Sequence, residues 1–233
     1  MLLQPQQLLT RIAGVFPDAI FYHHTREKII ALTIDDVGDP SSHLILDVID
    51  RHNQAIDNPG EKVSATFFVI ANYLRGDKTL LKRMIEGGHE IGNHGLEDRT
   101  HAHLSARSFE AEIKAAHEEL CLDGEKPINW FRPGRGRYNA PMKNILAAMG
   151  KSHGYQPYFA LGSMLPLDTF ELTHGPVFTL PYVANFVFPG SILVLHGGSK
   201  IRSQNTAAVL KTILPDLRQQ GYRVVSLSDL VSL

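Results

Sequence analysis

The sequence lacks the features of several protein classes. Cys121 is the only cysteine among its 233 residues, so an internal disulfide framework is excluded. We predict that Cys121 is a small core residue on a helix. The formal net charge is −1, with 23 basic and 24 acidic side chains, which does not support nucleic-acid binding. No apolar run approaches the roughly 20 residues of a membrane span, so we predict no membrane insertion.

The N-terminal segment also lacks a secretion signal. Residues 1–13 contain no basic region before an apolar core and no small-residue cleavage site. We therefore expect a cytoplasmic protein. The oligomeric state is not indicated by any feature of the chain.

Short apolar runs alternate with amphipathic segments along the whole chain. Several runs are continuously apolar, as in strands that are covered on both faces. The predicted strands are residues 28–34, 65–70, 89–92, 130–132, 158–161, 192–196 and 223–227. The predicted helices are residues 41–52, 78–87, 105–122, 140–149 and 204–220. This alternation predicts a single parallel α/β domain, and a barrel and an open doubly wound sheet both fit it.

The longest irregular region is residues 163–189, which contains four prolines. Loops of this length without secondary structure are uncommon in compact domains and are usually functional. We expect this region to line or cover a site.

Two adjacent carboxylates, Asp35 and Asp36, end the first apolar run. Each raises the cost of ionising the other unless a cation or a proton lies between them. Because adjacent side chains on a strand point in different directions, one can hold a metal ion while the other faces a substrate. A solvated acidic turn is the alternative interpretation.

Three further polar clusters follow predicted strands. They contain His94 with Asp98, Arg132 in an Arg-Pro-Gly sequence, and His196 before two glycines. The C-terminal ends of parallel strands share one edge, where active sites form. His94, Asp98 and Asp36 together offer one imidazole and two carboxylates to a divalent ion. Such a set suits Zn²⁺, and also Fe²⁺, Co²⁺ or Mn²⁺.

Two of these side chains suggest catalytic roles. A buried arginine at position 132 needs a carboxylate partner, and Asp35 and Asp168 are the candidates. His196, at the end of an apolar run, can act as a general acid. A histidine at the edge of the core, satisfied by the backbone, is the structural alternative.

The order of five motifs resembles the polysaccharide deacetylases (carbohydrate esterase family 4, the nodulation-protein-B homology domain). The motifs are TIDD at 33–36, ATFFV at 65–69, GHEIGNH at 88–94, FRPG at 131–134 and LH at 195–196. The resemblance covers residues 28–231 and implies a distorted (β/α) barrel of about seven parallel strands with a divalent metal at its C-terminal face. We therefore divide the chain into an N-terminal extension, residues 1–27, and a deacetylase-like catalytic domain, residues 28–233.

The resemblance implies a role for each matching residue. Asp35 would be the catalytic base and His196 the general acid, while Asp36 and His94 would be metal ligands. The usual third ligand is a histidine four residues after the first, and here Asp98 has that place, as in one branch of the family. We predict Asp98 as the third ligand. The alternatives for this place are His101 and His103.

The resemblance also implies the groups that surround the reacting atoms. Arg132 would orient Asp35, with Asp168 as the arginine's own partner, and a backbone N–H near Arg135 would help to hold the oxyanion. Leu195 would help to form the pocket for the acetyl methyl group. The predicted substrate contacts are Leu195, Arg135, Tyr138 and Trp130.

Together these features predict a metal-dependent hydrolase that removes acetyl groups from N-acetylated sugars, such as chitin-like or peptidoglycan-like oligosaccharides. It would use one divalent ion, with Zn²⁺ preferred. The same residues would also suit O-acetyl esters or small N-acyl amides. Departures from the family pattern at Val37, Arg135 and Gly197 favour a third alternative, an inactive sugar-binding homologue. The complete acid and base set argues against that alternative, because a binding module needs neither.

Overall fold

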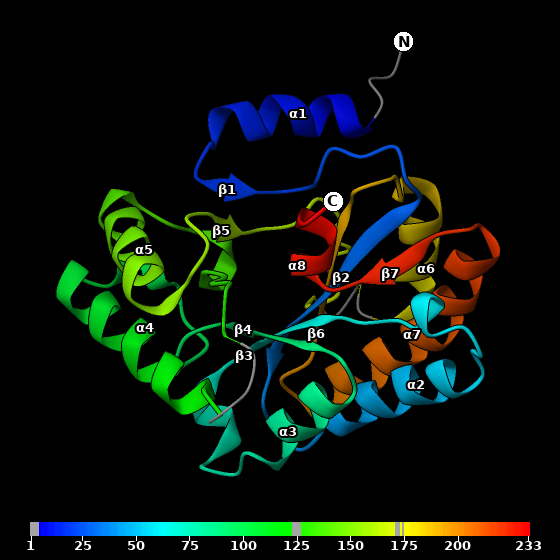
Figure 1. Cartoon of the computed structure of the whole chain (residues 1–233), viewed down its shortest axis with the longest axis horizontal. Coiled ribbons are helices and arrows are strands. Elements are labelled where there is room, and N and C mark those ends of the chain that lie inside the picture. The colour runs from blue at the N-terminus through cyan, green and yellow to red at the C-terminus, as the bar shows by residue number, and fades with distance from the viewer. Residues whose placement is uncertain (1–4, 123–126, 171–172, 174) are drawn as a thin grey trace.

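The computed structural model describes the chain apart from residues 1–4, 123–126, 171, 172 and 174 (Figure 1). The strands are β1 (Ala19–Ile20), β2 (Ile29–Val37), β3 (Thr66–Val69), β4 (Glu90–Asn93), β5 (Phe159–Ala160), β6 (Ile192–His196) and β7 (Arg223–Val225). The α-helices are α1 (Pro5–Val15), α2 (Ser42–Gln54), α3 (Thr79–Glu86), α4 (Ala106–Leu120), α5 (Ala140–His153), α6 (Pro176–Phe186), α7 (Lys200–Gln219) and α8 (Leu227–Val231). Short 3₁₀ helices are η1 (Pro59–Glu61), η2 (Ala71–Leu74), η3 (His101–His103) and η4 (Gly134–Gly136).

Strand β2 is the centre of the sheet. It pairs in parallel with β3 on one edge and with β6 and β7 on the other. All nine of its residues are buried, which explains why the strand reads as an almost continuous apolar run. Strand β4 extends the sheet by pairing in parallel with β3.

Single parallel bridges continue the pairing around a distorted barrel. Asn93 at the end of β4 bridges to Phe131, and Phe131 bridges to Phe159 of β5. Met164, just after β5, bridges to Leu193 of β6. The predicted barrel of parallel strands is therefore confirmed, although the predicted strand at 130–132 is reduced to one bridging residue.

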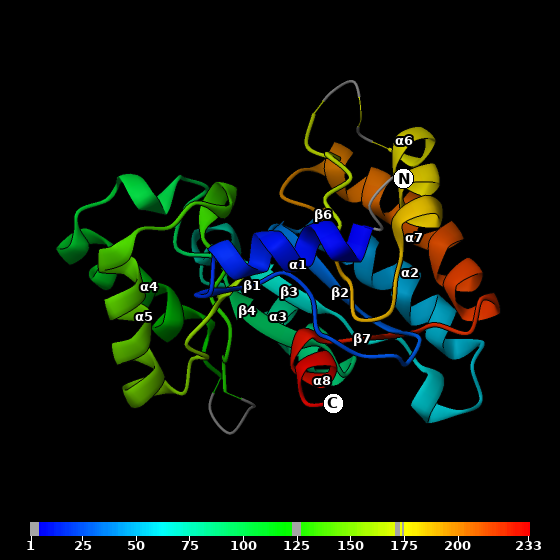
Figure 2. The same cartoon turned by 90° about the horizontal axis from the view of Figure 1, so that it is seen from above.

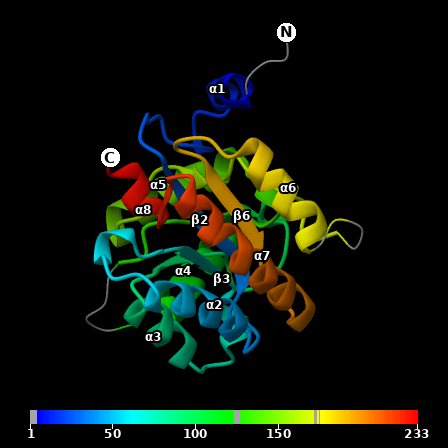
Figure 3. The same ribbon diagram turned by 90° about the vertical axis from the view of Figure 1, so that its right-hand side faces the viewer.

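Helices pack around the strands in two groups, with α4 and α5 on one side and α2, α3 and α7 on another (Figure 1). Seen from above, α1 lies across the strands (Figure 2). From the side, α1 lies at one end of the molecule and α3 at the opposite end (Figure 3). Within the described residues, no helix combines the length and the apolar character needed to cross a membrane.

The N-terminal segment is attached to the barrel rather than separate from it. Its strand β1 pairs in parallel with β5, with Ala19 opposite Phe159. His23 donates its backbone N–H to Gly190 O, 2.8 Å away, just before β6. Residues 19–24 are therefore joined to the barrel by backbone hydrogen bonds.

Two sequence predictions are wrong. Residues 163–189 are not irregular throughout, because α6 forms within them; Pro176 stands in its first turn, where a proline is tolerated. Cys121 is not a core residue, because α4 ends there and the side chain is exposed.

The core of the barrel should depend on Phe67, whose side chain is completely buried in β3 and packs edge-on against His89. We expect Phe67→Ala to lower the free energy of unfolding by about 3–5 kcal/mol, because lost burial and the remaining cavity add. Urea denaturation would measure the change. Phe178→Ala is the matched control, since Phe178 is 52% exposed and its loss should change stability by less than about 0.5 kcal/mol. Equal effects of the two changes would contradict this description of the core.

Candidate active site

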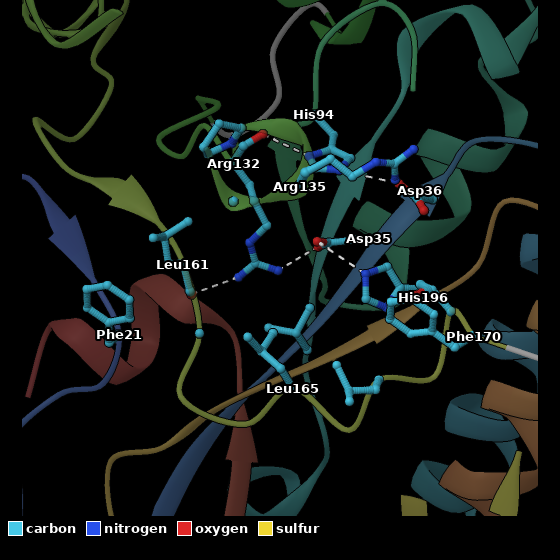
Figure 4. Close-up of a pocket in the computed structure, with 16 residues that line it drawn as sticks. Phe21, Asp35, Asp36, His94, Arg132, Arg135, Leu161, Leu165, Phe170 and His196 are labelled. Carbon is cyan, nitrogen blue, oxygen red and sulfur yellow. Dashed lines mark hydrogen bonds and ion pairs between the residues drawn. The ribbon is translucent and has the colours of Figure 1, made fainter. Parts of the chain in front are cut away.

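A pocket of about 470 Å³ lies at the C-terminal ends of the parallel strands (Figure 4). Its charged and imidazole side chains come from the motifs that the sequence singled out. They are Asp35, Asp36, His94, Arg132, Arg135 and His196. The rest of the lining is mostly apolar, so the polar groups face a restricted part of the pocket.

Asp35 is held by a buried arginine. Arg132 donates from Nη1 to Asp35 Oδ1 at 2.5 Å and to Thr33 Oγ1 at 2.8 Å. Its Nε donates to Ala160 O at 2.7 Å, and its Nη2 to Leu161 O at 3.1 Å. Burial lowers the pKa of Arg132, and the charge and hydrogen bond of Asp35 oppose that shift. Four hydrogen bonds therefore orient the guanidinium, which in turn orients the carboxylate.

Asp36 is buried next to Asp35 and faces two cationic or imidazole groups. Its Oδ1 lies 3.3 Å from His94 Nε2, and its Oδ2 accepts from Arg202 Nη1 at 3.3 Å. Burial alone would raise the pKa of Asp36, but the hydrogen bond to His94 and the charges of His94, His196 and Arg202 lower it to about 2. The carboxylate is therefore ionised at neutral pH.

The backbone of Asp36 is in the left-handed region, with φ of 59°. Such a conformation is uncommon for a residue other than glycine and costs on the order of 1–3 kcal/mol. Strain of this kind is concentrated at functional sites, where the surrounding structure holds it.

His94 and Asp36 have the arrangement of two ligands of one metal ion. The Nδ1 of His94 faces the carbonyl oxygen of Arg132 at 2.8 Å, which turns Nε2 toward Asp36. Two donors that bind one ion at about 2.0–2.2 Å lie roughly 3.0–3.4 Å apart, and the observed N···O separation is 3.3 Å. This pair therefore fits a divalent ion.

Asp98 is not grouped with these two donors. Its Oδ1 pairs with Arg135 Nη2 at 2.9 Å. Across residues 5–233, outside the short masked stretches, no three His, Cys, Asp or Glu side chains are arranged to hold a metal. The structure therefore brings together two of the three predicted ligands, while the third is held by an arginine.

Neither Asp98 nor its alternatives, His101 and His103, line the pocket. His101 is buried, its Nδ1 accepts from the Gly134 N–H at 2.8 Å, and its Nε2 lies 3.4 Å from Glu112 Oε1. His103 is exposed. His101 instead supports the turn at η4, which carries Arg135 with φ of 61°.

His196 is held by Asp168. The ring Nδ1 lies 2.7 Å from Asp168 Oδ1, and the backbone N–H of His196 donates to Asp168 Oδ2 at 2.9 Å. The other ring nitrogen, Nε2, lies 4.0 Å from Asp35 Oδ2. Asp168 was predicted as a partner of Arg132, and that pairing is wrong, because Arg132 pairs with Asp35 and Asp168 with the histidine.

The surroundings of His196 favour its protonated form. Burial lowers the pKa of the imidazole, but the hydrogen bond and charge of Asp168, with the charges of Asp35 and Asp36, outweigh burial and raise it. A histidine with a raised pKa remains a proton donor at a higher pH than an ordinary one. Geometry and charge thus favour an acid at His196 beside a carboxylate at Asp35.

Leu195 does not line the pocket, whereas Val194 does. Successive side chains of a strand point to opposite faces, so Val194 lies on the same face of β6 as His196 and Leu195 on the other. Leu195 is buried beside Asp168 and Thr206, around a separate small void. The apolar contact that was predicted for Leu195 is therefore supplied by Val194.

Trp130 and Tyr138 are also absent from the pocket lining. Trp130 is buried and donates its Nε1–H to Ser228 Oγ at 2.9 Å, near α8. The Tyr138 ring stacks on Phe159 with centroids 4.4 Å apart. Both aromatic rings pack within the fold rather than against the pocket.

Sequence reasoning missed several residues at the site. Phe21 comes from the N-terminal segment, and Leu165, Leu167 and Phe170 come from the loop after β5. The prediction that residues 163–189 line a site is confirmed by these three, but no spacing or motif indicated which side chains would do so. Arg202, from α7, likewise had no signal in the sequence.

Comparison with known proteins gives consistent results. The profile of the polysaccharide deacetylase family matches residues 22–154. The chain is 33% identical over 213 residues to the peptidoglycan-N-acetylglucosamine deacetylase of Bacillus cereus, covering 88% of this chain and 89% of that protein. It is 28% identical to a peptidoglycan-N-acetylmuramic acid deacetylase of Bacillus subtilis, covering 92% of this chain and 74% of that protein.

Solved structures of similar fold include members of the same family. A peptidoglycan N-acetylglucosamine deacetylase superposes with a TM-score of 0.79 at 25% identity, covering 94% of this chain and 96% of that one. A carbohydrate esterase family 4 pseudoenzyme from Bacillus anthracis has a TM-score of 0.74 at 22% identity, covering 92% of this chain and 69% of that one. The second likeness shows the fold alone.

Replacing Asp168 should change the titration of His196. We expect Asp168→Asn to lower the pKa of His196, because the variant removes the negative charge that stabilises the imidazolium. An NMR titration of the imidazole would measure the shift directly. A raised folded-state pKa stabilises the fold below the unfolded value of about 6.5, and this stabilisation is lost as the pH rises through the folded-state pKa.

The wild-type protein should therefore exceed Asp168→Asn in stability by more at pH 5 than at pH 9. Asp216→Asn on the exposed face of α7 is the control and should leave the His196 titration unchanged. An unaltered pKa in Asp168→Asn would show that the pairing does not control the histidine.

Proposed function

Since this chain belongs to the polysaccharide deacetylase family, we propose that it hydrolyses the acetamide group of N-acetylated sugar oligomers of the peptidoglycan or chitin type. The observation that carries the proposal is the placement of Asp35 between Arg132 and His196 in one pocket. Curated relatives are named as deacetylases of N-acetylglucosamine and N-acetylmuramic acid in peptidoglycan, which supports a substrate of this class.

Asp35 acts as the base in this proposal. Its Oδ1 is bound by Arg132, so Oδ2 is the oxygen that accepts a proton from the attacking water. The orientation by a buried, hydrogen-bonded guanidinium supports this role, because a base must be held within reach of the proton that it removes. The proton moves to Asp35 as the water oxygen bonds to the acyl carbon.

His196 acts as the acid. Asp168 binds its Nδ1, so Nε2 points toward Asp35 and the pocket. Protonation of the amine nitrogen by Nε2–H lets the C–N bond break, since an unprotonated amine is a very poor leaving group. The products are a carboxylate and a free amine.

Asp36 and His94 would hold the divalent ion that the family uses, and Asp98, which pairs with Arg135 in this structure, is the proposed third ligand. When bound, such an ion supplies Lewis acidity at the acyl carbonyl. Zn²⁺ suits a set of one imidazole and two carboxylates, and Co²⁺, Fe²⁺ and Mn²⁺ are alternatives.

The backbone N–H of Arg135 is the proposed oxyanion donor. The turn that carries it is held by the hydrogen bond from the Gly134 N–H to His101 Nδ1. A Cβ on Gly134 would lie 1.9 Å from Arg99 O, so the turn packs directly on the loop that contains Asp98. A donor held by the backbone in this way needs little rearrangement during the reaction, which is what makes such groups effective.

The alternative of an inactive sugar-binding homologue receives less support. Its motivation is the departures at Val37, Arg135 and Gly197, together with the pseudoenzyme among the structural neighbours. The paired Arg132–Asp35 and Asp168–His196 groups are what catalysis needs and sugar binding does not. Acetate release from N-acetylglucosamine oligomers, before and after chelation and with Zn²⁺ or Co²⁺ restored, tests the proposal. No release from metal-loaded protein would contradict it.

Changing the base should remove turnover without removing metal. We expect Asp35→Asn to lower kcat for acetate release about 10²–10⁴-fold, the usual contribution of general acid–base catalysis. Metal content serves as the control and should stay near the wild-type value. The unfolding transition should fall, because Arg132 loses its charged partner, so kcat is measured where the variant is folded. An equally active Asp35→Asn protein would rule out Asp35 as the base.

Changing the ligands should remove the metal itself. Asp36→Asn is the informative variant, because asparagine tolerates the left-handed backbone at this position while losing the charge. We expect Asp36→Asn and His94→Ala to lose stoichiometric Zn²⁺ and the rise in melting temperature that Zn²⁺ produces. Asp98→Asn should bind Zn²⁺ more weakly.

His103→Ala is the control, since His103 is exposed and outside the pocket. Elemental analysis and thermal unfolding with added Zn²⁺ provide the measurements. Unchanged Zn²⁺ affinity in Asp98→Asn would eliminate Asp98 as a ligand.

A further inference from the structure

One wall of the pocket is apolar and comes from segments far apart in the sequence. Phe21 lies in the N-terminal segment, Leu161 and Leu165 follow β5, and Val194 lies in β6. Figure 4 shows Phe21 and Leu161 on the Arg132 side of Asp35, with His196 and Phe170 on the opposite side. We call Phe21, Leu161, Leu165 and Val194 the apolar wall.

If the proposed function holds, the arrangement of the catalytic groups around the acyl carbon directs the acyl chain of the substrate toward this wall. Four groups surround the acyl carbon after water adds. In the proposed reaction the new oxygen would face Asp35, the nitrogen would face His196, and the former carbonyl oxygen would face Asp36 and His94. The fourth group, the acyl chain, is left to point toward Arg132 and the apolar wall.

The wall has no polar side chain to offer a sugar. Arg132 lies on the same side of Asp35 as Phe21 and Leu161 (Figure 4). Four of its five N–H donors already bind Thr33, Asp35, Ala160 and Leu161. A sugar hydroxyl placed there would lose hydrogen bonds to water without replacing them. A hydrocarbon chain would be stabilised by leaving water.

Gly162 lets the segment after β5 pack closely against β6 beside the wall. A Cβ on Gly162 would lie 2.3 Å from Val194 Cγ2, so no larger residue fits here. Leu165 is 49% exposed although it lines the pocket, so the described residues leave part of its apolar surface uncovered. The four side chains of the wall offer a longer apolar surface than one acetyl methyl group covers.

We propose that the pocket accepts amino sugars whose N-acyl chain is longer than acetyl, with the alkyl end against Phe21, Leu161, Leu165 and Val194. The inference rests on the proposed function and specifies its acyl group. Water adds its oxygen to the acyl carbon, the C–N bond breaks, and the amine leaves with a proton from His196. An alkanoate and the amino sugar are the products.

The test compares N-acetyl, N-propionyl and N-butyryl glucosamine oligomers with the metal-loaded full chain. We expect kcat/KM to rise with each added methylene, by up to about fourfold, because each buried CH₂ favours binding to that extent. Butyrate should also inhibit cleavage of the acetyl substrate more strongly than acetate does. This comparison measures product binding and needs only the acetyl substrate.

Two variants locate the effect. Phe21→Ala should lower the ratio of kcat/KM for the butyryl substrate to kcat/KM for the acetyl substrate. Leu165→Ala should lower it too, and because Leu165 is 49% exposed, this variant should fold normally. Phe178→Ala is the control, because Phe178 is 52% exposed on α6 and does not line the pocket. It should leave both the acetyl activity and the ratio unchanged.

The possible failures are distinguishable. Cleavage of the acetyl substrate with rejection of propionyl and butyryl would overturn this inference and leave the proposed function intact. If an apolar group on the sugar raised the rate and a longer acyl chain did not, the wall would contact the leaving amino sugar. That result would also overturn the inference. No release of any acyl group would refute the proposed function, and the inference with it.

Discussion

The contact between Arg132 and Asp35 is the interaction on which the site depends. The side chain of Arg132 is only 4% exposed, and it links β2 to β5 and the residue after it through four hydrogen bonds. The Phe68 ring lies 4.0 Å from its central carbon, which adds a cation–π contact. Breaking such a buried pair by removing one partner costs about 3–5 kcal/mol, because a charge is then left unpaired. The same side chain therefore stabilises the barrel and orients the carboxylate of Asp35.

The remaining acidic groups are each matched by a cation or a histidine. Asp36 faces His94 and Arg202, Asp98 faces Arg135, and Asp168 faces His196. For Asp36, these neighbours outweigh burial and keep the pKa of its carboxyl low. The arginines differ in exposure: the side chain of Arg202 is 34% exposed and that of Arg135 is 53% exposed. Exposed pairs are worth little, so Arg135 and Asp98 can separate at small cost, whereas the buried pair of Arg132 and Asp35 cannot.

Much of the fold could be predicted because its strands are buried on both faces. The predicted limits of β6 are the observed ones, and β2, β3 and β4 lie within a few residues of their predicted ranges. The segment at 130–132 also begins with apolar residues, but only Phe131 pairs, with Asn93 on one side and Phe159 on the other. Helix α6 was hidden by its prolines, and α1 was not among the predicted helices.

The sequence by itself determined which polar side chains reach the active edge. Asp35, Asp36, His94, Arg132 and His196 end apolar runs, and parallel strands bring such ends together whatever the loops do. Only the tertiary structure decided the partners: Asp168 with His196, Asp98 with Arg135, and Val194 rather than Leu195 in the pocket. The apolar wall is decided in the same way, since Phe21 and Leu165 are 144 positions apart and carry no shared periodicity. Local patterns report burial and strand ends, whereas contacts between distant segments depend on how loops pack, which no spacing in the chain encodes.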